Sequence, residues 1–251
     1  MRLKMETPLI DRKKFNRIRR HLPPQKSRPR VNDRRVLSGI IWIIKTGSAW
    51  RHLPEFYGNW KTVYSRFRRW SILGIFEKIF HIFTKRIDKN CIAMVDSTYV
   101  KAHRTSASMA CQNIDRKIGR SRGGLTTKIH LLCTEYGMPL DFLITGGEAS
   151  DVKSAPELIA RNRLKGLIAD KAYDSAVVRQ MLAKRKAIVC IPVKSNAKKI
   201  YQFDKTVYRK RHRIENLFSK LKDWKGIALR MHRNAHIFIS CVSLALIDLF
   251  F

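Results

Sequence analysis

The sequence has 251 residues, of which 45% are hydrophobic and 10% aromatic. This composition excludes a disordered chain, whose low hydrophobicity could not offset the entropy lost on ordering, and it suffices for one large domain or two modest ones. Lys and Arg number 52 against 19 Asp and Glu, which gives a formal net charge of +33. An enzyme of small neutral metabolites has no need of such a charge, so we expect a polyanionic partner, of which nucleic acid is the commonest.

Cysteine usage and the chain ends favour a cytoplasmic protein without a membrane anchor. The five cysteines are odd in number and none forms a C-x-x-C pair, which argues against a disulfide framework and a zinc module. The basic N-terminus is followed by no apolar run, so we expect no signal peptide. The apolar stretch 237–251 is too short to span a bilayer and contains Asp248, and we predict a buried helix there.

The first third of the chain has helical periodicity. After a short helix and an extended basic segment within residues 12–35, apolar residues recur at helical spacing over 36–44, 60–70 and 75–83. Gly and Pro residues separate these stretches. We therefore predict a small all-helical domain over residues 1–90.

The second of these helices has a basic face opposite its aromatic stripe. A basic helix in a small helical bundle is typical of helix-turn-helix arrangements, in which one helix enters the major groove of DNA. We expect DNA contacts from the cations of this face, which are Lys61, Arg66, Arg68 and Arg69. The alternative is that the face is only solvated.

Beyond residue 90 the pattern changes to strands alternating with helices. Strands are predicted at 91–95, 128–134, 140–144, 166–169 and 187–191, and helices at 155–163, 175–184 and 206–223. The order βββαβαβα is that of an α/β domain of the ribonuclease-H-like fold, which we assign to residues 91–251. The polar residues 101–127 are expected to form a mobile loop.

Three acids are candidates for a metal site. Asp96 and Asp170 each follow an apolar strand, and Glu215 lies on the last predicted helix of the domain. In the ribonuclease-H-like arrangement the first and fourth strands are neighbours and the final helix crosses nearby. Three carboxylates there would form the all-oxygen pocket that Mg²⁺ or Mn²⁺ prefers, and two such ions could clamp a phosphodiester. The alternative is that all three are ordinary surface acids.

The helix predicted at 206–223 carries a polar stripe beside its apolar one. Four residues at spacings of +3, +4 and +7 fall within a stripe about 60° wide at 100° per residue, namely Tyr208, Arg211, Glu215 and Lys222. Glu215 could bind metal while Arg211 and Lys222 hold phosphates and Tyr208 contacts DNA. A plain salt bridge between Arg211 and Glu215 would explain neither Tyr208 nor Lys222.

These motifs resemble those of the DDE transposases of bacterial insertion sequences, in the branch of insertion sequence five. The resemblance is carried by Tyr208-x2-Arg211-x3-Glu215-x6-Lys222, Val95-Asp-Ser-Thr98, Gly123-Gly-Leu-Thr-Thr-Lys-Ile-His130, Thr145-Gly-Gly-Glu-Ala-Ser-Asp151, Ala169-Asp-Lys-Ala-Tyr-Asp-Ser175, Gly47-Ser-Ala-Trp-Arg-His-Leu-Pro54 and Trp60-Lys-x3-Ser-Arg-Phe67. It extends from about residue 30 to the end of the chain and implies that Asp96, Asp170 and Glu215 are the metal-binding triad.

The resemblance also implies an activity and its partners. Such a transposase cuts the ends of its element and joins the freed 3′-hydroxyl to target DNA. Its partners would be the terminal inverted repeats, target DNA and further copies of itself assembled on DNA, in a bacterial cytoplasm near the nucleoid. Two alternatives remain open: a nuclease of the same fold that does not join strands, and a non-catalytic repressor that uses only residues 1–90.

Three further acids, Glu148, Asp151 and Asp174, lie in predicted loops next to the site and are not expected to belong to the triad. We expect Asp151 to order the loop before the first helix of the α/β domain, and Asp174 to cap the helix that follows it.

Overall fold

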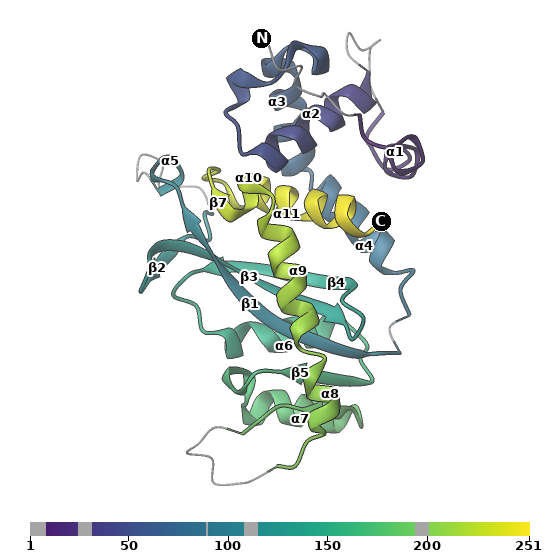
Figure 1. Cartoon of the computed structure of the whole chain (residues 1–251), viewed down its shortest axis with the longest axis vertical. Coiled ribbons are helices and arrows are strands. Elements are labelled where there is room, and N and C mark those ends of the chain that lie inside the picture. The colour runs from purple at the N-terminus through teal and green to yellow at the C-terminus, as the bar shows by residue number, and fades with distance from the viewer. Residues whose placement is uncertain (1–8, 25–31, 89, 108–114, 194–200) are drawn as a thin grey trace.

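The computed structural model describes residues 9–24, 32–88, 90–107, 115–193 and 201–251. A twisted mixed sheet with helices on both faces forms one end of the molecule (Figure 1). Helices from the two ends of the chain, within residues 12–84 and 235–250, form the other end and are called the helical layer below. The expected mixture of an α/β part and a helical N-terminal part is therefore confirmed.

The N-terminal helices are α1 (Arg12–Arg19), α2 (Asp33–Thr46), α3 (Trp60–Ile72) and α4 (Ile75–Thr84), with single 3-10 turns η1 (Trp50–His52) and η2 (Glu55–Tyr57) between α2 and α3. Gly47 ends α2 in the left-handed conformation, with φ of 66°, and Asn59 caps α3 by accepting a hydrogen bond from Lys61 N. The three helices expected from periodicity are confirmed. Part of the basic segment expected within residues 12–35 lies outside the described residues.

The end of the chain returns to these helices. The helix α11 (Ala235–Phe250) is buried along most of its length and packs against α2, α3 and α4 (Figure 1). Its side chains and those of α2, including Leu37, Ile40 and Leu244, belong to one hydrophobic cluster that also reaches Met94 of the sheet. The expected buried terminal helix is confirmed. No helix in the described ranges is both long enough and apolar enough to cross a membrane.

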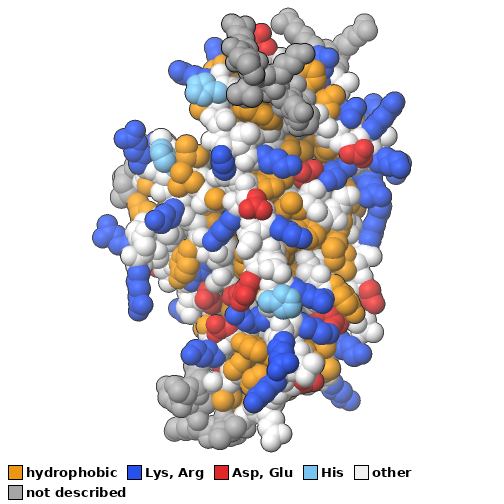
Figure 2. Space-filling model, viewed as in Figure 1, with side chains coloured by type: hydrophobic (Ala, Val, Ile, Leu, Met, Phe, Trp, Pro, Cys, Tyr) orange, Lys and Arg blue, Asp and Glu red, His pale blue; other side chains and the backbone are white. Residues whose placement is uncertain are grey.

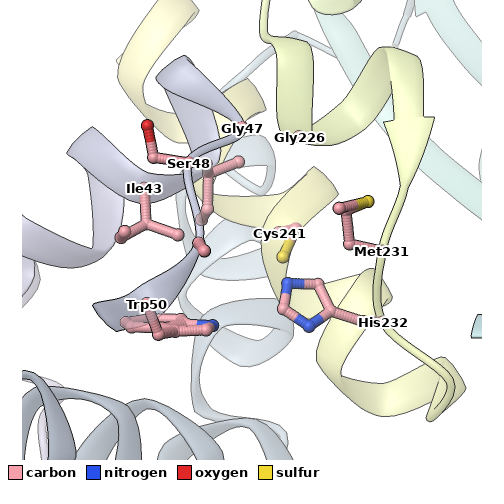
Figure 3. A pocket seen from close by; sticks show the side chains of 10 residues that line it. Ile43, Gly47, Ser48, Trp50, Gly226, Met231, His232 and Cys241 are labelled. Carbon is pink, nitrogen blue, oxygen red and sulfur yellow. The ribbon is translucent and has the colours of Figure 1, made fainter. Parts of the chain in front are cut away.

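A small pocket marks the junction of the two chain ends. It has a volume of about 130 Å³ and lies between the loop after α2, residues 226–232 and α11. Trp50, His232 and Cys241 line it (Figure 3). Trp50 Nε1 is buried and has no hydrogen-bond partner among the described residues.

The sheet is built around β1 (Ile92–Ala102). This strand is antiparallel to β3 (Gly124–Thr134) on one side and parallel to β5 (Gly166–Ala169) on the other. The outer strands are β4 (Pro139–Gly146), antiparallel to β3, and β6 (Ile188–Cys190), parallel to β5; β2 (Gly119–Ser121) and β7 (Leu229–Arg230) pair with the far ends of β3 and β1. Three antiparallel strands followed by two parallel ones reproduce the expected ribonuclease-H-like topology.

Helices cover both faces of this sheet. On one face, α6 (Asp151–Arg161) and α7 (Ala176–Lys184) enclose a second hydrophobic cluster. On the other lie α8 (Lys205–Arg209), α9 (His212–Lys222) and α10 (Lys225–Ala228), with α9 running across the strands (Figure 1). The remaining elements are the one-turn α5 (Arg104–Ala107) and η3 (Lys171–Tyr173).

Four element boundaries differ from the sequence expectations. The strand β1 does not end at Asp96 but continues to Ala102, because its second half pairs with β3. The helix α6 starts at Asp151 rather than Ala155. The single helix expected at 206–223 is two helices, since Lys210 and Arg211 interrupt the regular hydrogen bonding. Strand residues and α5 occupy much of 101–127, where a loop was expected; residues 108–114 lie outside the described part.

Candidate active site

Two of the three candidate acids come from neighbouring parallel strands. In the register of β1 and β5, Val95 is paired with Ala169, and Asp96 and Asp170 are the next residue of each strand segment. The side chain of Asp96 is about one-fifth exposed, and Asp170 caps the following 3-10 turn by accepting a hydrogen bond from Ala172 N at 2.5 Å. The sequence correctly predicted that these two positions are adjacent, although Asp96 lies within its strand.

Arg211 joins the third acid to the first. Its guanidinium donates to Asp96 Oδ2 at 3.0 Å and to Glu215 Oε1 at 2.5 Å. Glu215 lies on α9, which crosses this face of the sheet, and its side chain is half exposed. One cationic side chain therefore bridges carboxylates from a strand and a helix. The Arg211–Glu215 salt bridge, which the sequence offered only as the alternative to metal and phosphate roles for these residues, is present.

The electrostatics at Asp96 are those of a crowded acidic site. Burial is the largest cause that raises the pKa of Asp96 above its ordinary value, and the nearby Asp170 and Asp151 raise it further. The Ser97 N–H and Arg211 act in the opposite direction. Because like charges disfavour ionisation and a cation favours it, this site stabilises positive charge.

The donor set suits a hard divalent cation. Asp96, Asp170 and Glu215 offer only oxygen atoms, as Mg²⁺ and Mn²⁺ prefer, and a guanidinium already lies between two of them. Within the described ranges, no three Asp, Glu, His or Cys side chains are grouped closely enough to hold a metal ion as they stand. In this arrangement Arg211 occupies one oxygen of Asp96 and one of Glu215.

A buried lysine supports this region from the other face of the sheet. Lys128 is only 3% exposed and donates from Nζ to Ala149 O at 2.6 Å and to Asp151 Oδ1 at 2.9 Å. The same Asp151 oxygen accepts a hydrogen bond from Ser97 Oγ at 2.8 Å. Asp151 thus links the start of α6 to the residue after Asp96. Its expected structural role is present, but Asp151 is the first helical residue rather than part of the preceding loop.

Tyr173 and Asp174 lie shortly after Asp170 in the chain, next to the candidate acids. Tyr173 is buried near the acids. Burial, together with the charges of Asp151, Asp96 and Asp170, raises the pKa of its hydroxyl, which is therefore neutral. Tyr173 was not among the predicted site residues, and its place three residues after Asp170 was the available signal. Asp174 does not cap α7, because Ser175 does so, and Asp174 pairs with Arg179 instead.

The remaining residues of the helical stripe are less closely grouped. Tyr208 is half-buried and packs edge-on against Phe203, with ring centroids 5.4 Å apart. Lys222 lies about 10 Å along α9 from Glu215, at 1.5 Å per residue, and burial lowers its pKa. Lys222 makes no hydrogen bond or ion pair within the described part of the chain. The structure therefore joins Arg211 to the acids, while Lys222 lies two turns away.

The basic face of α3 is only partly available. Arg66 forms an ion pair with Asp33 and stacks on Trp70, with its guanidinium 4.7 Å from the ring centre. Lys61, Arg68 and Arg69 are exposed. Three of the four cations assigned to DNA contact are thus at the surface, and Arg66 also stabilises the helical layer.

Comparison with known proteins assigns the chain to a family. Residues 88–247 match the family described as a transposase DDE domain, and residues 10–80 match a family described as putative transposases of the IS4/5 family. This chain is a DDE transposase. The resemblance to the transposases of bacterial insertion sequences is confirmed, and the protein is a DNA transposase enzyme.

The transposase is also similar to several individual proteins. It is 36% identical over 125 residues to a putative transposase for insertion sequence element IS6501 of Brucella ovis, covering 48% of this chain and 95% of the relative. It is 33% identical over 96 residues to the uncharacterized protein y4sN of Sinorhizobium fredii, covering 37% and 76%. A crystal structure of the Mos1 strand transfer complex aligns with 81% of each chain at 10% identity and a TM-score of 0.28.

Proposed function

We propose that this transposase cuts the ends of its own insertion sequence and joins the resulting 3′-hydroxyl to target DNA at a single acidic site. The observation that supports this proposal most is the Arg211 bridge between Asp96 and Glu215, next to the strand register that makes Asp96 and Asp170 neighbours.

We assign Asp96, Asp170 and Glu215 as the ligands of Mg²⁺ or Mn²⁺, with two ions at the site. When bound, such ions would activate the attacking oxygen and neutralise charge on the phosphodiester. The raised pKa of Asp96 fits this role, since a carboxylate crowded by other acids gains most from an added cation.

The cationic side chains have a separate task. We assign Arg211 a contact with the phosphate beside the scissile bond, because its planar guanidinium suits bidentate hydrogen bonding to phosphate oxygens. Lys222 has a partly buried ammonium group without an acidic partner among the described residues, and we assign it a point contact with the DNA backbone. Tyr208, on α8, contacts DNA at the same face.

DNA recognition is assigned to the helical layer. We propose that residues 1–90 act as the DNA-binding domain and residues 91–251 as the catalytic domain, with Lys61, Arg68 and Arg69 contacting DNA and Arg66 holding α3 in place. The partners would be the terminal inverted repeats, target DNA and further protomers assembled on it, in the bacterial cytoplasm at the nucleoid. The net charge of +33 supports a DNA partner.

The decisive test of the reaction uses DNA from the element itself. Inverted repeats flanking the gene would be cloned as short duplexes and incubated with the full-length protein, Mg²⁺ and a supercoiled target plasmid. The proposal predicts 3′-end cleavage and covalent joining to the plasmid. Cleavage without joining of a pre-cut end would favour the nuclease alternative, and sequence-specific binding with neither reaction would favour the repressor.

A further inference from the structure

The β2–β3 hairpin is a basic projection that the proposed roles above leave unused. The strand β1 pairs with β3 only as far as Thr126, and β4 pairs with it only from Thr127. Residues 124–125 therefore pair only with β2, and Arg122 and Gly123 form the two-residue turn between Ser121 and Gly124. The tip is a two-stranded ribbon, and a ribbon of this kind fits the major groove of B-DNA.

The cations of this ribbon are exposed and unpartnered. The side chains of Arg120 and Arg122 lie at the surface, and neither forms a hydrogen bond or ion pair with any described residue. The turn satisfies its own polar groups through Ser121, whose Oγ donates to Gly124 O and accepts from Gly123 N and Thr126 Oγ1. Figure 2 shows Lys and Arg side chains projecting along the edge where Figure 1 places β2.

Arg120 shares a face of the sheet with Asp96. Arg120 is paired with Leu125 of β3, and Asp96 with Leu131. Because 125 and 131 are an even number of residues apart on one strand, their partners point to the same side. The two pairing positions on β3, Leu125 and Leu131, are six residues apart, so Arg120 and Asp96 are offset by roughly 20 Å along the strand direction at about 3.4 Å per residue. This offset corresponds to about six base pairs of DNA at 3.4 Å per pair.

Glu148 lies against the opposite face of the hairpin. A β-carbon at Gly119 would stand 1.2 Å from Glu148 Oε2, so the Glu148 carboxylate rests directly on this glycine. Gly119 and Arg120 are consecutive strand residues and present opposite faces. The negative charge of Glu148 is thus directed away from the surface that carries Arg120.

A buried arginine fixes the base of the hairpin. Arg230 is fully buried and donates to the carbonyl oxygens of Arg116 and Lys117 and to Thr127 Oγ1. It also donates to the carbonyl oxygens of His232 and Arg233, so this one side chain ties the segment before β2 to the segment after β7. A rigidly held ribbon loses little entropy when it binds a partner.

We propose that the β2–β3 hairpin is a DNA-binding finger that holds the duplex about six base pairs from the phosphate at Asp96. The inference rests on the proposed function, because it takes Asp96 as the point where the DNA is cut. Arg120 and Arg122 supply two phosphate contacts, and Arg230 keeps them at a fixed distance from the acids.

The test compares two double variants of the full-length protein by their binding to a 30-base-pair duplex of arbitrary sequence in EDTA. Arg120→Gln with Arg122→Gln removes the finger cations. Arg163→Gln with Lys165→Gln removes two exposed cations just before β5, at the opposite end of that strand from Asp170. Urea unfolding of both variants checks that the fold is retained.

Each lost phosphate contact lowers the salt slope of log affinity by about 0.9. The finger variant should lose about two units of slope. Between 50 and 200 mM salt, the factor by which its affinity falls should therefore be about ten times smaller than the factor for the wild type. The control variant should keep the wild-type slope. An unchanged slope in the finger variant, or an equal loss in both variants, would overturn the inference. A wild-type protein without salt-dependent DNA affinity would instead overturn the proposed function.

Discussion

At the scale of single residues, buried charges set the structure around the acids. Lys128 is a cation placed inside a sheet, and such a group is tolerated only when it is paired and hydrogen-bonded. Its partners Asp151 and the Ala149 carbonyl satisfy it, and Asp151 in turn accepts from Ser97. The contacts of Lys128, Asp151 and Ser97 thus fix the backbone next to Asp96 without involving the three candidate metal ligands.

Replacing Lys128 with Met should lower the free energy of unfolding by about 2 kcal/mol, because hydrogen bonds to charged groups of this kind contribute that amount. Urea denaturation would measure the loss. Lys165→Met, at an exposed site, is the control and should change stability by less than about 0.5 kcal/mol. Equal stability of the two variants would mean that the Lys128–Asp151 pair contributes nothing.

His130 gives the fold a defined pH dependence. It is fully buried, and burial lowers its pKa to about 4 from the ordinary 6.5. Between these values the unfolded chain binds a proton that the folded protein does not, so stability falls as pH drops from 6.5 towards 4. The full effect is about 3 kcal/mol at 1.36 kcal/mol per pKa unit.

The matching experiment is urea unfolding at pH 7 and pH 4.5 for the wild type and His130→Gln. The variant should be less stable at pH 7, where it loses the hydrogen bond with Thr145, yet lose less stability on acidification. If both proteins lose the same stability between the two pH values, His130 does not titrate as described.

At the scale of elements, close backbone approach fixes how α10 sits on α2. A β-carbon at Gly226 would stand 2.6 Å from the Ile44 carbonyl oxygen, which is main chain and cannot rotate away. Gly226→Ala should therefore force the two helices apart and cost about 1–3 kcal/mol. Thermal or urea unfolding would measure this loss.

Gly74→Ala is the informative comparison for Gly226→Ala. Gly74 has φ of 64° and no neighbouring atom within 4 Å of its added β-carbon, so the variant would show only the strain of a left-handed alanine, about 1 kcal/mol. A Gly226 variant as stable as the wild type would contradict the close packing of α10 on α2.

Sequence patterns predicted most elements because their periodicity reflects one buried face each. The helices over 36–44, 60–70 and 75–83 and the β3–β4 hairpin were predicted for this reason. The patterns failed where tertiary contacts decide the outcome. The strand β1 continues past Asp96 because Ser97 to Lys101 pair antiparallel with β3, which the predicted strand end at Asp96 did not anticipate.

The candidate site was predicted in the same uneven way. Strand order placed Asp96 and Asp170 at neighbouring strands, whereas the Arg211–Glu215 pair was considered only as the alternative to metal and phosphate roles for these residues. The contact between Arg211 and Asp96, and the placement of Lys128 and Tyr173, join residues far apart in the chain. Such contacts depend on how α9 and α6 dock on the sheet, which no local pattern encodes.

At the scale of the whole molecule, α11 couples the two ends of the chain. Side chains from α11, the N-terminal helices and the sheet belong to one hydrophobic cluster. We therefore expect the helical layer and the sheet to unfold together in a single cooperative transition.

The tryptophans allow a direct test of this coupling. Four of the five, Trp42, Trp50, Trp60 and Trp70, lie among the N-terminal helices, and Trp224 lies between α9 and α10. Their fluorescence therefore reports mainly on the N-terminal helices, whereas far-ultraviolet circular dichroism reports on the whole molecule. Urea curves from Trp fluorescence and circular dichroism should coincide. Two separated midpoints would mean that the helical layer is an independent unit.

If Asp96, Asp170 and Glu215 act together as the metal-binding acids of one cleavage site, then losing any one of them should stop cleavage without weakening DNA binding. Asp96→Asn, Asp170→Asn and Glu215→Gln would be compared in cleavage of element-end DNA in Mg²⁺ and in binding of the same DNA in Ca²⁺. We expect each variant to bind DNA as the wild type does and none to cleave it. Cleavage by any variant within about tenfold of the wild-type rate, a barrier change of only about 1.4 kcal/mol, would contradict the role given to that residue.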